Sequence, residues 1–180
     1  MRYLLVVEME VGDMIETAMV GRDGVANGTS ALDGKLALHR GIVQVAGDAS
    51  VIYPDILRKL ANEFEPFQSI LIRHEQVLLA QAQQSAGCNA SHTVESRMCR
   101  WLLRIRDLTQ SNEMSLTQEF LAQMLGVRRT SVTLVAGMLQ SSGLIRQLRG
   151  TIEILDPGAM ESAACECYAR VRSHYERLFS

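Results

Sequence analysis

Residues 117–140 carry the clearest hydrophobic pattern of the chain, two helical periods separated by a turn. A first helix is predicted over residues 117–124, because Thr117 is a favourable N-cap and the apolar positions after it repeat at helical spacing. Its buried face consists of Phe120, Leu121, Met124 and Leu125. Gly126 ends this helix where a left-handed residue costs least, and a second helix begins near Arg128. The buried face of the second helix consists of Val132, Val135 and Leu139.

The spacing of these residues predicts a helix-turn-helix. Ala122 is small at the point where the two helices would cross, and the turn glycine and two core anchors follow in order. The polar face of the second helix offers Arg128, Arg129, Thr130, Ser131 and Thr133. These side chains suit phosphates and base edges, and they lie at the end of the helix that enters the major groove. The alternative is a plain helical hairpin with a solvated polar face.

The pattern before this unit predicts a small antiparallel β unit followed by helices. Apolar and β-branched runs separated by glycine turns predict strands at residues 3–8, 14–20, 36–38, 41–45 and 49–53. Helical periods follow at residues 55–64, 67–88 and 92–108, with Pro54 and Pro66 at two of the starts. In the helix at 92–108, the residues expected to be buried are Val94, Met98, Trp101, Leu102 and Ile105. Those expected outside are Arg97, Arg100, Arg104 and Arg106.

A hairpin and a last helix are predicted after the helix-turn-helix. Two short strands at 144–148 and 151–155 flank the turn Arg149-Gly150, which gives a wing with a basic tip. Asp156-Pro157 then begins a helix that is predicted to continue to about residue 179.

The long helix at 67–88 carries a stripe of near-heptad spacing that is apolar early and polar late. The stripe consists of Phe67, Ile70, Leu71, His74, Val77, Leu78 and Gln81. A long helix between two separate units often pairs with its own copy, so we expect a homodimer through this stripe. The alternative is ordinary packing of the stripe on the β unit.

Positive charge gathers where DNA contact is expected. The chain has a net charge of −2, which alone argues against general affinity for nucleic acid. Residues 117–150, however, hold four arginines against one acid, whereas residues 1–66 hold six basic and ten acidic side chains. This distribution is typical of a local DNA-binding face.

The cysteines and histidines give no enzyme or metal hypothesis. Cys165 and Cys167 are predicted on one helix, about 200° apart around its axis, so they would point nearly opposite ways. Cys88 and Cys99 are far from them in sequence, and the four histidines show no ligand spacing. Buried, reduced structural thiols are therefore expected. The chain has no nucleophile–base constellation and no phosphate-binding loop motif, so no enzyme, metal or cofactor is expected.

The beginning of the chain, MRYLLVVEMEV, has too short an apolar run for a signal peptide and lacks a small-residue cleavage site. No apolar run approaches membrane-spanning length. We expect a protein of the cytoplasm with no membrane partner.

The stretch LTQEFLAQMLGVRRTSVT at residues 116–133, preceded by two helices and followed by a wing, resembles the carboxy-terminal half of the Crp/Fnr (cyclic-AMP receptor protein/fumarate-nitrate regulator) transcription factors. The resemblance is strong over residues 94–156 and weaker over residues 12–93. It implies a two-fold dimer on double-stranded DNA, with RNA polymerase as a further candidate partner. By position, Arg129 matches an arginine that reads guanine in many members, and Thr117 matches a phosphate contact. Ser131 and Thr133 share the face of Arg129.

The sequence departs from the family at several positions. Thr130 stands where many members have a base-reading glutamate, and Leu134 stands where some have a second arginine. The resemblance thus implies an operator different from the common one. In the sensor unit, Arg22 replaces the acid that would hold a ribose hydroxyl, which implies independence from cyclic AMP. The chain also begins late for the family, so a large part of the expected β-roll is absent.

We therefore expect an α+β fold with a partial antiparallel, cyclic-nucleotide-binding-like β-roll at 1–65, a dimerisation helix at 66–90, a winged helix-turn-helix at 91–156 and a carboxy-terminal helix at 157–180. The expected function is sequence-specific transcription regulation, and the alternative is a ligand-sensing or protein-docking module with a vestigial helix-turn-helix. The expected DNA contacts are Thr117, Gln118, Arg128, Arg129, Thr130, Ser131, Thr133, Arg146 and Arg149. The open face of the shortened β unit is expected to pack on the long helix, because it would otherwise expose apolar strands to water.

Overall fold

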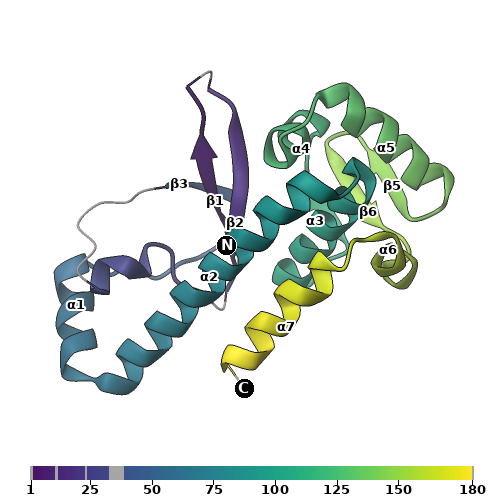
Figure 1. Ribbon diagram of the computed structural model, residues 1–180. Helices are drawn as coiled ribbons and strands as arrows, with labels where there is room; N and C mark the ends of the chain where they lie inside the picture. The colour runs from purple at the N-terminus through teal and green to yellow at the C-terminus, as the bar shows by residue number, and fades with distance from the viewer. Residues whose placement is uncertain (1, 11, 23, 33–38, 180) are drawn as a thin grey trace.

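A small sheet, a long diagonal helix and a helical domain with a second small sheet make up the chain (Figure 1). The computed structural model describes residues 2–10, 12–22, 24–32 and 39–179. The predicted α+β class is confirmed. Of the helices in the described part of the chain, none is both long enough and apolar enough to cross a bilayer.

The first sheet is antiparallel, with the strand order β2-β1-β3. Its strands are β1 (Arg2–Glu8), β2 (Met14–Val20) and β3 (Arg40–Val45). A short 3-10 helix, η1 (Gly28–Leu32), follows β2. The predicted strand at 36–38 lies outside the described residues. The strand predicted at 49–53 is wrong, because that stretch pairs with no strand among the described residues and its apolar Val51 is almost fully exposed.

Two helices connect this sheet to the helical domain. Pro54 is the first residue of α1 (Pro54–Glu63), as predicted. The long helix α2 (Glu65–Ser91) has 27 residues and continues past Gly87. A Cβ added to this glycine would have no atom within 4 Å. The third helix, α3 (Val94–Thr109), begins at the N-cap Thr93, whose side chain accepts a hydrogen bond from the Ser96 amide.

The helical domain contains the predicted helix-turn-helix and wing. Helix α4 (Gln118–Leu125) and helix α5 (Arg129–Ser141) are joined by a turn at Gly126. The wing strands β5 (Ile145–Leu148) and β6 (Thr151–Ile154) form a sheet with β4 (Glu113–Ser115), in the order β4-β6-β5. Strand β4 is only three residues long, and the sequence pattern does not predict it.

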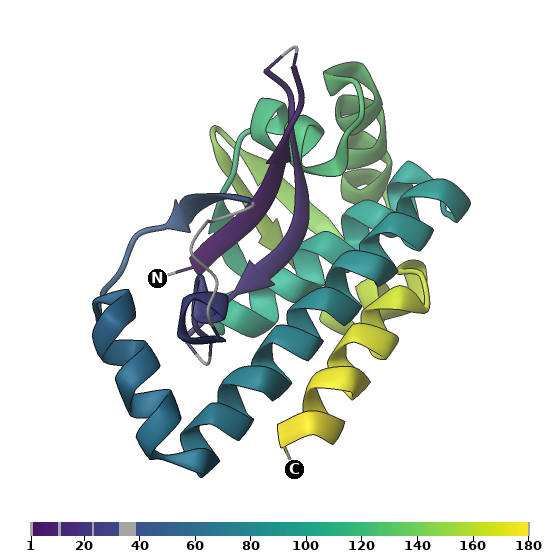
Figure 2. The same ribbon diagram turned by 60° about the vertical axis from the view of Figure 1, so that its left-hand side comes forward.

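The carboxy-terminal helix predicted from residue 157 to 179 is two helices. Helix α6 (Pro157–Ala163) ends at Ala164, whose backbone is extended with φ −74° and ψ 155°, and α7 (Cys167–Phe179) begins after this break. Helix α7 then runs beside α2 (Figures 1 and 2). The prediction failed because residues 164–166 contain neither glycine nor proline, so the sequence gives no local signal for the break.

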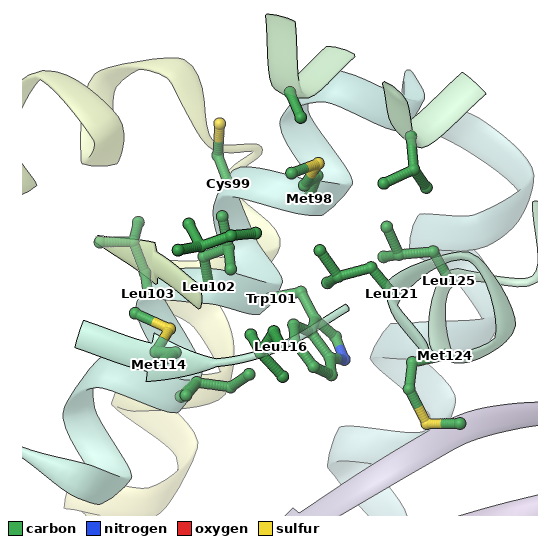
Figure 3. Packing of buried hydrophobic residues seen from close by; sticks show 14 of the residues in the cluster. Met98, Cys99, Trp101, Leu102, Leu103, Met114, Leu116, Leu121, Met124 and Leu125 are labelled. Atoms are coloured by element: carbon green, nitrogen blue, oxygen red, sulfur yellow. The ribbon is translucent and has the colours of Figure 1, made fainter. Parts of the chain in front are cut away.

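The buried residues of β1 and β2 lie on both faces of the sheet. One face places Leu4, Val6 and Met19 in the same core as the helix-turn-helix. The other face places Leu5, Ala18 and Val20 against Leu78 of α2. The expectation that the β unit packs on the long helix is confirmed within one protomer, and the sheet also supports the helical domain. Figure 3 shows the shared core around Trp101, with Leu121, Leu125 and Met124 on the side of α4.

Helix α3 is buried over more of its circumference than its sequence suggests. The predicted core residues Met98, Trp101, Leu102 and Ile105 are fully buried. Arg97 and Arg100, expected outside, are buried as well, so that part of the prediction is wrong. Arg97 donates to the Leu125 carbonyl at the end of α4, where helix carbonyls have no partner of their own.

Two glycine substitutions test the turn before α5 with opposite expected signs. Gly126 has φ 62°, and an added Cβ would lie 3.2 Å from Ile15 Cδ1 on β2. Gly126→Ala should therefore lower the free energy of unfolding by about 1–2 kcal/mol, because an L side chain is strained in the left-handed region. Gly137→Ala, in α5 with no atom within 4 Å of the added Cβ, should raise it by about 0.5–1 kcal/mol. Denaturant unfolding of both variants measures this, and equal shifts would contradict the assigned conformation of the turn.

Candidate nucleic-acid interface

The turn between α4 and α5 is closed by backbone hydrogen bonds that fix the direction of α5. The Gly126 amide donates to the carbonyls of Ala122 and Gln123, and the Val127 amide donates to Ala122 at 3.0 Å. Arg128 is then the N-cap of α5. The predicted anchors Val132, Val135 and Leu139 are buried, so the opposite face of α5 is presented to solvent.

Thr117 has two roles that its single hydroxyl can combine. Its oxygen accepts a hydrogen bond from the Phe120 amide at 3.1 Å, which caps α4. This leaves the hydroxyl hydrogen on the exposed side of the helix start, where the positive end of the helix dipole also favours an anion. The site can therefore donate to a phosphate oxygen.

Gln118 connects α4, α5 and the wing. Thr133 Oγ1 lies 2.7 Å from Gln118 Oε1, and Gln118 Nε2 donates to Gln147 Oε1 at 2.8 Å. From α5, Gln140 Oε1 accepts a hydrogen bond from the Gln147 backbone amide at 2.9 Å. Gln140 and Gln147 were not among the predicted site residues, and a glutamine pair in two separate elements gives no local signal. The three glutamines hold the wing at a fixed place beside α5.

The predicted arginines differ in how they are held. Arg129 and Glu119 lie 3.8 Å apart at the closest atoms and are both well exposed, a loose ion pair that water and salt weaken. Arg146 is bonded to Glu153 on the neighbouring strand through Nε at 2.8 Å. Arg149 is exposed at the wing tip, beside Gly150 with φ 75°. The exposed guanidinium groups of Arg128, Arg129 and Arg149 are therefore more available to a ligand than that of Arg146.

A shallow hollow lies between the start of α4, the start of α5 and the wing. Residues that line it include Thr117, Gln118, Arg129, Gln147 and Gly150. The structure thus brings together three of the predicted contacts, whereas Arg128, Thr130, Ser131 and Thr133 lie along α5, with Ser131 half-buried. Leu134 continues the exposed face of α5 and is 67% exposed, which is unusual for a leucine on a polar helix face.

The stripe on α2 that was expected to form the dimer interface is used inside the protomer. Five of its seven residues are buried there: Leu71, His74, Val77, Leu78 and Gln81. Gln81 Oε1 accepts a hydrogen bond from the Met19 backbone amide at 3.1 Å, and His74 Nε2 accepts one from the Val25 amide at 3.2 Å. The polar positions of the stripe satisfy backbone groups of the β unit, as the alternative interpretation had it.

The opposite face of α2 is exposed along its length. Its central line consists of Ile72, Gln76, Leu79, Gln83, Ala86 and Ala90, all exposed in the single chain. The steps between them alternate between four and three residues, which is the spacing of a coiled-coil seam.

Four thiol and imidazole groups meet where α2 ends and α7 begins. One ligand atom from each of Cys88, His92, Cys165 and Cys167 lies within 4.8 Å of all the others. The expectation that Cys165 and Cys167 point opposite ways is wrong, because the chain leaves the helix between α6 and α7 and turns both thiols to one side. Burial raises the pKa of the Cys88 thiol to about 12, against the opposing effect of the Arg100 guanidinium.

One part of the chain matches a known family of domains. Residues 96–163 match the Crp-like helix-turn-helix domain. The comparison with curated proteins finds no match.

Several solved structures share the fold over most of the chain. A transcriptional regulator of the Crp/Fnr family from Eubacterium rectale has 17% identity and a TM-score of 0.71, covering 90% of this chain and 76% of that one. A Crp/Fnr-family regulator from Thermus thermophilus has 22% identity and a TM-score of 0.67, with 91% and 83% covered. FixK2 from Bradyrhizobium japonicum has 11% identity and a TM-score of 0.65, again with 91% and 83% covered. At these identities the likeness shows the shared fold.

Proposed function

From the premise that this chain has a Crp-like helix-turn-helix domain and the fold of the Crp/Fnr-family regulators, we propose that it is a sequence-specific, DNA-binding transcription regulator that acts without cyclic AMP. The observation that carries the proposal is the hollow between α4, α5 and the wing, which gathers an amide, a hydroxyl and a guanidinium on one exposed face. The hydroxyl and the amide suit a phosphate backbone, and the guanidinium suits a base edge in the groove that α5 enters.

Each residue has a distinct expected part in DNA binding. Arg129, at the first position of α5, reads a guanine edge, for which a bidentate guanidinium is well suited. Thr117 and Arg149 contact phosphate on the two sides of α5. Leu134 contacts a thymine methyl group, because an exposed apolar side chain on this face has no polar edge to bind.

Independence from cyclic AMP is supported by the contacts that the loop after β2 makes with α2. By the family resemblance, Gly24 is the last residue of the segment 21–24 that stands where the phosphate loop would be, and a Cβ added to it would lie 2.6 Å from His74 Nε2. The next residue, Val25, is hydrogen-bonded to the same imidazole. This loop is seated on α2, and Arg22 cannot accept a hydrogen bond from a ribose hydroxyl.

We also propose that the protein pairs with its own copy through the exposed face of α2, the seam of Ile72, Leu79 and Ala86. Two recognition helices must be about 34 Å apart to reach successive half-sites on one side of the duplex, which a symmetric dimer provides. The face of α2 that packs on the β unit is not available for pairing, so the seam lies on the opposite side from the stripe first expected.

Two arginine variants separate base reading from phosphate contact. A site is first selected from random duplexes, and binding is then measured by fluorescence anisotropy at several salt concentrations. Arg129→Ala should lose about 1–3 kcal/mol of discrimination between the selected site and its point variants. Arg149→Ala should weaken all duplexes alike and reduce the salt slope by about one unit. Arg170→Ala, exposed on α7, is the matched control and should change neither. If no duplex is enriched, the protein is a docking or sensing module and the proposal is wrong.

Three aspartate substitutions on α2 identify the pairing face. Ile72→Asp with Leu79→Asp should give monomers in sedimentation, because it places like charges across a two-fold seam. Ile70→Asp is the matched control, since Ile70 is 51% exposed against 41% for Ile72 and lies about 200° from it around the same helix. It should remain dimeric. The reverse result would return the interface to the stripe at 67–81, and a monomeric wild type would refute pairing.

Calorimetry tests the absence of a cyclic-nucleotide response. Titration of the full chain with cyclic AMP and cyclic GMP should give no heat of binding, because the loop is occupied by His74 and the ribose acceptor is missing. Binding at micromolar concentration would contradict this.

A further inference from the structure

The four groups at the end of α2 have the geometry of ligands around one ion. Cys88 Sγ and Cys165 Sγ are 3.5 Å apart, and Cys167 Sγ and His92 Nδ1 are 3.6 Å apart. A tetrahedral ion with zinc–sulfur bonds of about 2.3 Å places its ligand atoms about 3.8 Å from one another. We propose that Cys88, His92, Cys165 and Cys167 bind one zinc ion per chain, in a structural site that fastens α7 to α2.

The backbone presents these groups from two pairs of close positions. Cys88 and His92 are four residues apart at the end of α2, so they share one face, and the His92 amide still donates to the Cys88 carbonyl at 3.0 Å. Cys165 and Cys167 flank Glu166 at the break between α6 and α7, where the Tyr168 amide donates to the Cys165 carbonyl. All three thiols are buried, as structural zinc sites require, and no water position is left among four protein ligands.

Groups around the four ligands hold them in the orientation that a metal needs. His92 presents Nδ1 to the thiols, and its other nitrogen, Nε2, lies 3.2 Å from the Glu166 carboxylate. A carboxylate on the second imidazole nitrogen is the usual partner of a metal-binding histidine, because it fixes the tautomer. Gln84 Nε2 donates to Cys167 Sγ at 3.0 Å, which supports a thiolate there.

The charge around the cluster suits a zinc–thiolate complex. Three thiolates and one divalent ion carry a net negative charge, and burying such a charge is costly without a partner. Two arginines of α3, Arg97 and Arg100, are buried beside the cluster and interact electrostatically with Cys88. Their positive charge would offset the negative charge of the complex.

Two other chemistries fit the same residues less well. A Cys88–Cys165 disulfide would need the sulfur atoms to close from 3.5 Å to about 2.05 Å, and it would leave Cys167, His92 and Glu166 without a role. An iron–sulfur cluster spreads its four ligands over two or more iron atoms, so ligands on different irons lie further apart than the 4.8 Å within which all four groups lie here.

The place of the site gives it a mechanical consequence. It joins the junction between α2 and α3 to the junction between α6 and α7, so one ion would fix how the helical domain is held against α2. Loss of the ion should therefore loosen the hold of α7 on the end of α2, while the core around Trp101, which includes Tyr168 of α7, stays packed.

Metal content of the full chain, purified in reductant and without a histidine tag, tests the site directly. One zinc per chain is expected by mass spectrometry, and Co²⁺ in its place should show the intense visible bands of tetrahedral thiolate coordination. Cys167→Ser and His92→Gln should lose the ion. Glu166→Ala, on an exposed side chain that folding does not need, should weaken zinc affinity about 10–100-fold. Cys99→Ser is the matched control, because Cys99 is equally buried but lies outside the cluster, and it should keep the ion.

Chelation gives a second readout. The melting temperature of the wild type is measured once with free zinc at about a hundred times its Kd and once after chelation. It should be about 5–10 °C lower in the chelated sample. The Cys99→Ser protein should respond equally, and Cys167→Ser should not respond. A wild type that binds no zinc, a Cys88–Cys165 disulfide in the reduced preparation, or more than one iron with sulfide would each overturn the proposal. None of these measurements involves DNA, so their failure is distinct from failure of the DNA-binding proposal.

Discussion

The two-sided burial of the sheet β2-β1-β3 is the constraint on which the rest of the structure depends. Three short strands cannot cover their own apolar residues, so each face needs another element. Helix α2 covers one face through Leu78, and the helix-turn-helix core covers the other through Leu4, Val6 and Met19. The sheet therefore joins the long helix and the helical domain in one body, and neither can be displaced without exposing apolar strand residues to water.

The two faces of α2 therefore differ: the inner face packs on the sheet, and the outer face is exposed. The inner face is partly polar because it must satisfy backbone groups of the sheet and its loop, which Gln81 and His74 do. The outer face carries isoleucine, leucine and alanine at heptad spacing among glutamines. Such a seam is modest in apolar area, so its proposed pairing would depend on close helix contact at the alanines rather than on a large hydrophobic interface.

The sequence predicted correctly the helix cap and the turns, which depend on the residue type at a single position. Thr117 caps α4, Gly126 takes the left-handed turn, and Gly150 closes the wing, each as the residue type requires. Tertiary contacts determined what was predicted wrongly. The stripe at 67–81 shows an apolar period that fits either a second copy or the sheet, and nothing in its spacing distinguishes the two. The break at residues 164–166 interrupts a good helical period, and only the packing of α7 on α2 explains where the thiols of Cys165 and Cys167 point.

The contact between Ile15 and Gly126 links the sheet to the start of α5. Ile15 Cδ1 lies 3.2 Å from the position of a Cβ added at residue 126, so the hairpin of β1 and β2 packs directly on the turn that sets the direction of α5. On the far side of the same domain, Arg97 donates to the Leu125 carbonyl at the end of α4, and the thiol cluster lies between the end of α2 and the start of α7. The turn of the helix-turn-helix is thus held from one side by the sheet and from the other by α3. A shift of α2 relative to α3 would change both supports together, because α2 carries the sheet on Leu78 and two of the four cluster residues at its end. In this chain the direction of α5 is therefore tied to the long helix by packed contacts on both sides of the turn.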